Sequence, residues 1–295
     1  FDNHKNKLHL IVLVESEEDI EKANTRLDEL EGELKESLPF EEFKKPIKSI
    51  EESDFVSGFG EEEFKLSVEK AKEYIESGDI MQVVCSQRMS IPFNADPVAL
   101  YRSVRQLNPS PYMYYLNLDE FHIVGSSPEI LARLEDGKIT VRPIAGTRRR
   151  GKDEEDDKAM EEDMVNEPKE IEEHLMLIDL GRNDVGRVAK PGTVTVTEKF
   201  GIEKYSHVMH MVSNVEADLD KGLSAIDLFK ATFPAGTVSG APKVRAMEII
   251  DEFEPVKRGI YGGAVGYLSW QGNMDMAIAI RTAVIKDEVL YIQAG

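Results

Sequence analysis

The sequence alternates between short apolar runs and longer amphipathic stretches, and this pattern restricts the possible folds more than any other. The apolar runs have the length and the β-branched and aromatic content of strands, whereas hydrophobic residues at steps of three and four predict helices. We expect strands over Leu8–Val14, Ile80–Met89, Tyr112–Leu116, Phe121–Val124, Ile130–Leu134, Ile139–Val141, Val194–Val196, Ile260–Leu268, Ala277–Ile285 and Val289–Gln293. We expect helices over Ile20–Leu34, Phe64–Ile75, Lys169–Leu180 and Lys243–Phe253. Strand hairpins interrupted by helices indicate an α+β fold.

Residues 39–60 separate two parts of the sequence. This segment carries Pro39 and Pro46, glycines and serines near its end, and little hydrophobic periodicity, which is typical of a linker. We therefore expect a boundary near Ser53, with residues 1–52 as the remnant of an N-terminal region plus linker, and residues 53–295 as the main domain. The first residues do not resemble an initiator sequence and the last ones leave a strand-like run, so we expect both ends to be cut from a longer protein.

The composition of the chain argues against several classes of protein. The 295 residues carry a formal net charge of −20, which argues against a nucleic-acid partner, because a phosphate backbone requires a basic surface. An anionic substrate would therefore need a local cationic pocket. No apolar stretch approaches the ~20 residues of a membrane span. The only cysteine, Cys85, rules out an intramolecular disulfide, so we expect a protein of the reducing cytoplasm with no membrane partner.

Glu170, Glu173 and His174 lie at helical spacing. Residues three positions apart share a helix face with Cβ atoms about 5–6 Å apart, so the two carboxylates can hold a hard cation such as Mg2+. A solvated acidic face is the alternative, because glutamate-rich helices are common. The apolar run Leu175–Ile178 follows directly and makes a merely solvated face harder to accept.

Two further residues are candidates for binding or proton transfer. Arg281 lies within the apolar run Ala277–Ile285. A buried arginine is costly unless it is paired, so we expect a carboxylate partner from the protein or from a ligand. His210, taken by itself, is better interpreted as a core histidine with satisfied hydrogen bonds.

Three glycine-containing segments indicate turns or close backbone approach. Pro143–Arg148 presents backbone N–H groups and a hydroxyl, which suits a carboxylate, although a plain turn is the better interpretation of this segment alone. Ser239 is a plausible cap for the helix that begins near Lys243, and its loop could bind an anion there. Gly259–Tyr267 is rich in glycine for a strand, which indicates close approach of another group. The residues thus predict an anion pocket beside a divalent metal.

Six motifs in this order resemble the chorismate-utilising enzymes. They extend over about residues 60–295 at family-like spacing, and they are Pro143–Arg148 (PIAGTR), Glu173–Arg187 (EHLMLIDLGRNDVGR), Tyr205–His210 (YSHVMH), Ala235–Met247 (AGTVSGAPKVRAM), Arg258–Tyr267 (RGIYGGAVGY) and Ile280–Arg281. The resemblance implies a four-layer α/β/β/α sandwich of two packed sheets flanked by helices, with the site at its centre. Residues 53–295 would then be a chorismate-binding catalytic domain.

Two positions distinguish the branches of this family. Aminodeoxychorismate synthases usually carry a nucleophilic lysine where this sequence has Ala145, and enzymes that add water usually carry a lysine base where it has Gln82. The sequence therefore resembles the branch that uses ammonia and forms anthranilate. Pro111, Tyr112 and Met113 are similar to the residues of that branch that line its tryptophan feedback site.

The resemblance also implies roles for individual residues. Glu129 is the expected general acid for loss of the 4-hydroxyl, with His210 assisting proton transfers and Thr237 supporting the ring. Glu170 and Glu173 are the expected Mg2+ ligands. The expected substrate-binding residues are Gly146 and Thr147 at the ring carboxylate, and Tyr261, Arg281 and the backbone of Gly295 at the pyruvyl carboxylate.

The function implied by this resemblance is that of an Mg2+-dependent lyase of tryptophan biosynthesis, the large (aminase) subunit that converts chorismate and ammonia to anthranilate and pyruvate. A glutamine amidotransferase subunit would supply the ammonia, because Cys85 lacks the sequence context of a glutaminase nucleophile. Tryptophan would be the feedback inhibitor. The alternatives are an aminodeoxychorismate synthase and an inactive truncated chain that binds chorismate. The inactive chain is an alternative because family members continue past Gly295 with further metal-site glutamates. We therefore expect the metal site of this chain to be incomplete and its activity to be low.

Overall fold

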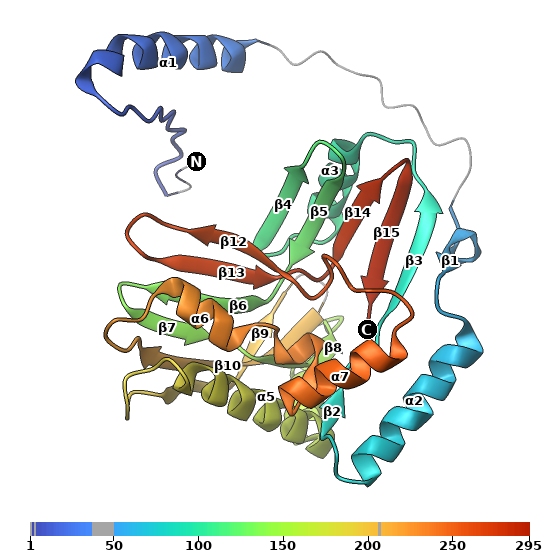
Figure 1. Cartoon of the computed structure of the whole chain (residues 1–295). Helices are drawn as coiled ribbons and strands as arrows, with labels where there is room; N and C mark the ends of the chain where they lie inside the picture. Colours follow the sequence, from blue (N-terminus) through green and yellow to red (C-terminus); the bar gives the residue numbers. More distant parts are fainter. Residues whose placement is uncertain (1, 3, 37–49, 206–207) are drawn as a thin grey trace. The chain divides into compact units, whose positions relative to one another are not determined.

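The computed structural model describes residues 2, 4–36, 50–205 and 208–295, and contacts within the chain form two compact units, Phe1–Ile50 and Glu51–Gly295 (Figure 1). Half of the linker predicted over residues 39–60, namely residues 39–49, lies outside the described residues. In the first unit, the 3-10 helix η1 (Glu17–Asp19) leads into helix α1 (Ile20–Lys35), which confirms the predicted amphipathic helix.

The strand predicted over Leu8–Val14 is wrong. This segment has no partner strand among the described residues, and Ile11 and Leu13 are 80% and 84% exposed. An isolated strand leaves its backbone hydrogen bonds unmade and buries no side chains, so apolar composition alone does not stabilise it.

Six antiparallel strands form the first sheet of the second unit, in the order β1-β3-β15-β14-β5-β4 (Figure 1). Their bounds are β1 (Val56–Ser57), β3 (Gln87–Pro92), β4 (Tyr112–Asn117), β5 (His122–Ser127), β14 (Thr282–Lys286) and β15 (Val289–Ala294). Helix α3 (Pro97–Leu107) covers one face of this sheet, where Val124, Ile285 and Leu290 are buried in a shared core. The apolar residues that alternate along these strands therefore anchor the sheet to one helix.

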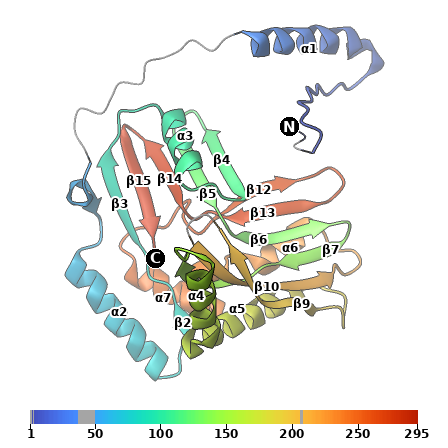
Figure 2. The ribbon, with the colours of Figure 1, turned by 180° about the vertical axis from the view of Figure 1, so that it is seen from behind.

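A seven-stranded sheet forms the other half of the unit, in the order β12-β13-β6-β7-β10-β8, with β9 also paired to β10. Its strands are β6 (Ile130–Glu135), β7 (Lys138–Val141), β8 (Ile144–Arg149), β9 (Thr195–Lys204), β10 (Val208–Asp218), β12 (Ala264–Leu268) and β13 (Met274–Ile278). Helix α5 (Pro168–Gly186) packs on β8 and β10, α4 (Glu154–Asn166) on β8 and α6 (Ala225–Thr232) on β6 (Figure 2). The largest core cluster, which includes Ile139, Val185 and Leu228, lies between the helices α5 and α6 and the sheet.

A third group of elements lies beside the two sheets. Helices α2 (Glu61–Glu76) and α7 (Lys243–Phe253) share a core of Ala71, Ile80, Ile249 and Phe253. The short strands β2 (Gln82–Val83) and β11 (Gly240–Ala241) pair with each other, and the 3-10 helices η2 (Glu52–Asp54) and η3 (Gly236–Val238) lie in the connections.

The predicted α+β class, two sheets flanked by helices, is confirmed. The helices predicted over Phe64–Ile75, Lys169–Leu180 and Lys243–Phe253 are α2, α5 and α7. Within the described residues, no helix is both long and apolar enough to cross a membrane. The helices α3, α4 and α6 were not predicted.

Two predicted strands prove to be pairs of strands. Ala277–Ile285 was expected to be one buried strand, but β13 ends at Ile278 in the seven-stranded sheet and β14 begins at Thr282 in the six-stranded sheet. Arg281 lies at the break with a φ of 49°, a backbone conformation that non-glycine residues seldom adopt. Ile80–Met89 likewise divides into β2 and β3, which leaves Cys85 between strands rather than within one.

The chain passes between the two sheets at a second point. Strand β5 ends at Ser127 in the first sheet and β6 begins at Ile130 in the second. The two passages are joined by hydrogen bonds from the Ile278 N–H to the Glu129 carbonyl, 3.0 Å, and from the Ser126 N–H to the Arg281 carbonyl, 3.1 Å. Glu129 and Arg281 are therefore brought together although they are far apart in sequence.

Gly125 in β5 leaves space for the ring of Tyr114, which lies on the neighbouring strand. A Cβ added at Gly125 would be 2.0 Å from Tyr114 Cζ, and the Tyr114 hydroxyl is 2.6 Å from Thr282 Oγ1. We expect Gly125→Ala to displace the ring and to lower the free energy of unfolding by about 1–3 kcal/mol, the range for overpacked cores. Urea denaturation measures this change.

The control is Gly186→Ala, because a Cβ there meets no atom within 4 Å. A combined Gly125→Ala and Tyr114→Ala protein should lose less than the sum of the two single losses, since the clash is then gone. Equal stability of Gly125→Ala and wild type would show that the ring does not need this space.

Candidate active site

Glu129 is the buried acid of the site. It lies in the passage between β5 and β6, and only 8% of the residue is exposed. Burial raises the pKa of its carboxyl to about 8, although the Thr237 hydroxyl and the positive charge of Arg281 both act to lower it. At neutral pH this carboxyl is therefore mostly protonated and can donate a proton.

Thr237 is presented to Glu129 by η3. A Cβ added at Gly236 would be only 1.9 Å from Leu180 Cδ2, so glycine is required for the loop to pack this closely on α5. Thr237 Oγ1 is buried and makes no hydrogen bond of regular geometry with the described residues, although it lies close enough to influence the pKa of Glu129. Such an unpartnered buried hydroxyl is what a ligand-binding group requires before its ligand arrives.

Ser239 was interpreted as the cap of the helix that begins near Lys243, and this is wrong. Residue Pro242 precedes α7, and the Ser239 hydroxyl donates instead to the Ala235 carbonyl, 2.7 Å away. The serine thus closes the loop that carries Thr237, and no anion site at the helix start is needed to explain it.

His210 lies on β10, opposite Thr147 on β8. Its Nδ1 atom is 3.0 Å from Thr147 Oγ1 and 3.2 Å from the Gly146 carbonyl oxygen. Since a carbonyl only accepts, a bond to Gly146 requires the proton on Nδ1 and leaves Nε2 free to accept one. Burial lowers the pKa of His210, so the ring is neutral near pH 7. The predicted Gly146, Thr147 and His210 are thus brought together; Ser206 and His207 of the same motif lie outside the described residues.

Arg281 was expected to be buried, and this is wrong: its side chain is exposed. The reason is its place at the break between β13 and β14, where the chain leaves one sheet before entering the other. No ion pair joins its guanidinium to a described residue, but its charge lowers the pKa of both Glu129 and His210. Together with His210 and Pro128, Arg281 lines a cavity of about 200 Å³. An unpaired guanidinium at such a cavity suits an anionic ligand.

Tyr261 and the main chain of Gly295 lie beside each other. Burial raises the pKa of the Tyr261 phenol, while the nearby Arg258 charge and the Gly295 backbone lower it. Gly295 follows β15, and a Cβ added there would be 2.7 Å from the Cys85 carbonyl oxygen. Only glycine fits this position without a shift of the backbone, which leaves the Gly295 main chain accessible to the phenol.

Glu170 and Glu173, the predicted Mg2+ ligands, lie on the first turns of α5. Glu170 Oε1 pairs with Arg148 Nη1 at 2.9 Å, and its Oε2 would be 3.3 Å from a Cβ at Gly146. Glu173 Oε1 accepts a hydrogen bond from Gln82 Nε2 at 3.4 Å. The described residues contain no group of three or more acidic, histidine or cysteine side chains that could hold a metal. Two carboxylates fit Mg2+ only when water and substrate supply the remaining oxygens.

The predicted inhibitor residues are near this site. Pro111 and Tyr112 line a second cavity, of about 380 Å³, which shares Pro111, Pro128 and Tyr205 with the cavity at Arg281. The Tyr112 hydroxyl donates to Asp275 Oδ1 at 2.6 Å, and burial together with this bond raises its pKa to about 12. Met113 follows on β4, where it pairs with Ser126.

Arg148 is a residue of the site that the sequence analysis did not single out. It bridges Asp163 on α4, 2.6 Å from Arg148 Nε, and Glu170 on α5. The run of three arginines at residues 148–150, facing the acidic run that starts at Asp153, was the available signal. Arg149 and Arg150 pair with Asp156 and Asp157 in the same way.

Comparison with known proteins gives a consistent result. A family model described as chorismate binding enzyme matches residues 1–295. The anthranilate synthase component 1 of Pseudomonas aeruginosa is 58% identical over 298 residues, which cover 100% of this chain and 61% of that protein. That of Aquifex aeolicus is 62% identical over 239 residues, which cover 81% of this chain and 48% of that protein. This chain therefore spans less than two thirds of the length of these relatives.

Solved structures show the same fold. The crystal structure of anthranilate synthase component I from Streptococcus pneumoniae superposes with a TM-score of 0.91 at 41% identity, covering 100% of this chain and 65% of that one. The menaquinone-specific isochorismate synthase of Escherichia coli superposes with a TM-score of 0.79 at 21% identity, covering 94% of this chain and 63% of that one. The second similarity concerns the fold alone.

The raised pKa of Glu129 makes the stability of the protein depend on pH. The carboxyl has a pKa of about 8 when folded and 4.5 as its ordinary value, so folding favours the protonated form. The resulting stabilisation is complete below pH 4.5 and is lost as the pH rises through 8. We expect the difference in unfolding free energy between wild type and Glu129→Gln to fall by on the order of 4 kcal/mol between pH 4.5 and 9.

Denaturant titrations of both proteins across this range measure that difference. His174 and His210 titrate in both proteins alike, so their contributions cancel in the subtraction. A difference that stays constant with pH would show that the Glu129 carboxyl has an ordinary pKa and is not desolvated.

Proposed function

The chain belongs to the chorismate-binding enzyme family, and from this membership we propose that it carries the active site of an anthranilate synthase component I. The proposed reaction is a lyase reaction of tryptophan biosynthesis in the cytoplasm, in which chorismate and ammonia give anthranilate and pyruvate. The observation that carries the proposal is the buried carboxyl of Glu129, which is protonated at neutral pH and lies beside the buried Thr237 hydroxyl, a group that makes no hydrogen bond of regular geometry with the described residues.

Glu129 has the properties of the general acid. We assign it the protonation of the 4-hydroxyl of chorismate as this group leaves as water, while ammonia adds at the neighbouring ring carbon. The free Thr237 hydroxyl would hold the ring beside it. Because the Nε2 atom of His210 is free to accept a proton, His210 would assist the proton transfers of hydroxyl loss and of pyruvate elimination.

The anionic ends of the substrate would be held by two separate groups. Arg281 has a guanidinium without an ion pair to the described residues, and such a planar fork binds a carboxylate in two hydrogen bonds. With the Tyr261 hydroxyl and the Gly295 main chain it would hold the pyruvyl carboxylate. Gly146 and Thr147 would contact the ring carboxylate from the other side, next to Glu170.

Mg2+ would bind through Glu170 and Glu173, one helical turn apart on α5. When bound, the ion would act as a Lewis acid toward the ring carboxylate. The pairing of Glu170 with Arg148 leaves its second oxygen beside Gly146, where the ring carboxylate is expected. This arrangement supports a metal that is completed by substrate and water.

Ala145 and Gln82 favour ammonia over other nucleophiles. Ala145 is buried on β8 opposite Met211, and its methyl group cannot attack the ring. Gln82 donates a hydrogen bond to Glu173, and an amide does not activate water as a lysine base does. These residues support the anthranilate-forming branch over aminodeoxychorismate or isochorismate formation.

A separate glutamine amidotransferase subunit is the proposed source of ammonia. The single cysteine, Cys85, is half-buried, and burial raises the pKa of its thiol, which is unfavourable for a nucleophile. Tryptophan is the proposed feedback inhibitor, with Pro111, Tyr112 and Met113 as its contacts in this chain.

The proposed function is tested by incubating the full-length gene product with chorismate, ammonium and Mg2+ while anthranilate fluorescence is followed. We expect anthranilate and an equal amount of pyruvate, with loss of activity in EDTA. Glutamine should replace ammonium only after the amidotransferase subunit is added. Formation of 4-amino-4-deoxychorismate as the main product would assign the protein to the other ammonia-using branch, and absence of any product would leave a protein that only binds chorismate.

Because Arg281 is exposed, its substitution should affect substrate binding and not the stability of the fold. Arg281→Gln should weaken chorismate binding by about 2–5 kcal/mol, provided that the bound substrate removes the guanidinium from water, since this range applies to desolvated charge pairs. Its thermal midpoint should stay near that of wild type, because no described residue forms an ion pair with Arg281. Isothermal titration calorimetry and thermal unfolding measure the two effects.

The matched control is Arg182→Gln on α5, an exposed arginine that pairs with Asp179 on the same helix. It should change neither binding nor the thermal midpoint appreciably. An Arg281→Gln protein that binds chorismate as well as wild type would remove Arg281 from the proposed site.

A further inference from the structure

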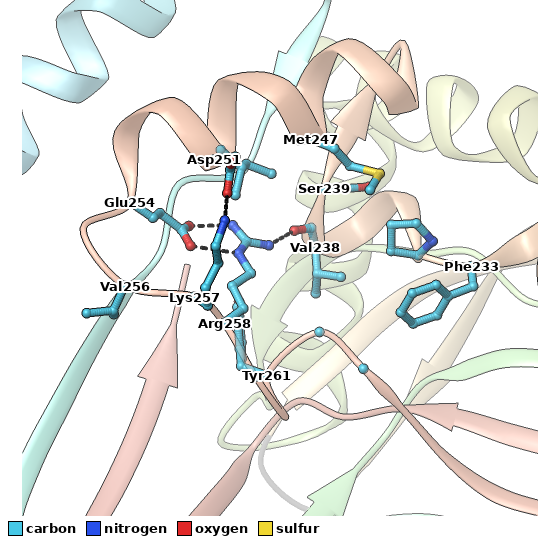
Figure 3. Close-up of a pocket in the computed structure, with 15 residues that line it drawn as sticks. Phe233, Val238, Ser239, Met247, Asp251, Glu254, Val256, Lys257, Arg258 and Tyr261 are labelled. Atoms are coloured by element: carbon cyan, nitrogen blue, oxygen red, sulfur yellow. Dashed lines mark hydrogen bonds and ion pairs between the residues drawn. The ribbon is translucent and has the colours of Figure 1, made fainter.

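Arg258 lies at the start of the turn that carries Tyr261, and its guanidinium is enclosed by protein groups. Its side chain is 17% exposed and that of its partner Glu254 is 4% exposed. Nε donates to Glu254 Oε2 at 2.9 Å, and Nη2 donates to Glu254 Oε1 at 2.5 Å and to the Val84 carbonyl at 2.7 Å. Nη1 donates to the Val238 carbonyl (Figure 3).

These bonds leave Arg258 little capacity to bind a substrate. A guanidinium has five N–H donors, and four of those of Arg258 are taken by Glu254, Val84 and Val238. Arg281 contrasts with it, because its guanidinium forms no ion pair with the described residues. The Arg258 guanidinium therefore holds the surrounding protein segments in place instead of binding a ligand.

The groups that Arg258 holds belong to three different parts of the proposed site. Val238 follows Thr237 directly in η3. The guanidinium carbon lies 5.4 Å from the centre of the Tyr261 ring, within the range of a cation–π contact. Val84 belongs to the segment that borders Gly295, since a Cβ at Gly295 would be 3.1 Å from Val84 Cγ1.

The partner of Arg258 is fixed in turn. Glu254 Oε1 accepts hydrogen bonds from the Ser86 N–H at 2.9 Å and from Ser86 Oγ at 2.8 Å. The Ser86 hydroxyl also accepts from Gln293 Nε2 at 2.8 Å, which ties the network to β15. The Arg258 carbonyl is held by Arg88 Nη2 at 3.0 Å. A buried pair with this many satisfied partners has one geometry and resists displacement.

We propose that Arg258 is a positioning residue that fixes the relative positions of Tyr261, Thr237 and the Gly295 main chain. The substrate carboxylate and the reacting hydroxyl are then held at a fixed distance from each other. This inference rests on the proposed function, because those three groups are substrate contacts only in that proposal. The network also borders a cavity of about 370 Å³ lined by Phe233, Met247 and Tyr261, so the turn has open space to move into if Arg258 is lost (Figure 3).

Arg258→Lys is the direct test in the full-length enzyme. Lysine keeps the charge, but it cannot bridge a carboxylate and two carbonyls in one plane. We expect a higher KM for chorismate and a lower kcat, with kcat/KM reduced about 10- to 100-fold, as for a displacement of about 1 Å at reacting groups. Arg258→Lys combined with Tyr261→Phe should lose less than the product of the two single losses, because both act on the same contact.

Arg245→Lys is the matched control. Arg245 lies on α7, pairs with Asp79 and Glu248, and has its guanidinium carbon 5.2 Å from the Tyr74 ring, so it has the same kinds of contact away from the site. Its kinetic constants should equal those of wild type. If Arg258→Lys does not fold, Glu254→Gln serves instead, since it keeps the shape of the partner and weakens its hold; the same change in KM and kcat, of smaller size, is then expected.

The possible results distinguish a failure of the positioning role of Arg258 from a failure of the proposed function. A wild-type enzyme that makes no anthranilate would overturn the proposed function and this inference with it. An active wild type together with Arg258→Lys kinetics equal to wild type would overturn only the inference, even if the thermal midpoint falls, because the arginine would then serve the fold alone. Multiplicative losses in the double variant would also contradict it.

Discussion

The two passages of the chain between its sheets bring together the residues at which the proposed chemistry would occur. Each passage is short, and the hydrogen bonds from the Ile278 N–H to the Glu129 carbonyl and from the Ser126 N–H to the Arg281 carbonyl hold them side by side. This crossing removes the Glu129 carboxyl from water while Arg281 remains exposed. A buried carboxyl with a raised pKa therefore lies near a guanidinium that forms no ion pair with the described residues, and both features depend on this crossing.

Helix α5 and the 3-10 helix η3 supply further residues of the proposed site. Helix α5 brings Glu170 beside Gly146, which lies on strand β8 and not in the predicted turn, and it brings Glu173 beside Gln82. The 3-10 helix η3 packs on α5 through Gly236 and presents Thr237. The chain has a net charge of −20, and among the described residues Arg148 and Arg258 are paired with carboxylates, whereas Arg281 forms no ion pair. A guanidinium without an ion pair in the described part of the chain gives an acidic protein a place for an anionic substrate.

The sequence predicted the helices better than the strands, and the reason is physical. Helices α2, α5 and α7 bury one face, so their 3.6-residue period was visible. A continuous apolar run does not show where a strand leaves one sheet for another, and for this reason Ala277–Ile285 and Ile80–Met89 were each taken as one strand. Leu8–Val14 has the composition of a strand but no partner to pair with among the described residues. The acidic helix α4 shows little apolar periodicity and was missed.

The candidate site was predicted mainly from the resemblance between motifs, and its geometry was not available from spacing. Glu129 and Arg281 are brought together only by the sheet topology, and the burial that raises the pKa of Glu129 has no signal in the residues next to it. The exposure of Arg281 was predicted wrongly, because its apolar neighbours belong to two strands that end on either side of it. The network around Arg258 joins it to Val84, 174 positions away in sequence, and joins Glu254 to Ser86, 168 positions away, so local spacing could not reveal the whole network.

Glu129 should be a protonated acid at neutral pH, and infrared difference spectroscopy reports its protonation state. The carbonyl stretch of a protonated carboxyl is distinct from the bands of a carboxylate, and Glu129→Gln identifies the band that belongs to this residue. Wild type should show this band at pH 6.5 and lose it with a midpoint near pH 8. A band that disappears near pH 4.5 would rule out the proposed role, because Glu129 would then be ionised under the conditions in which it is proposed to donate a proton.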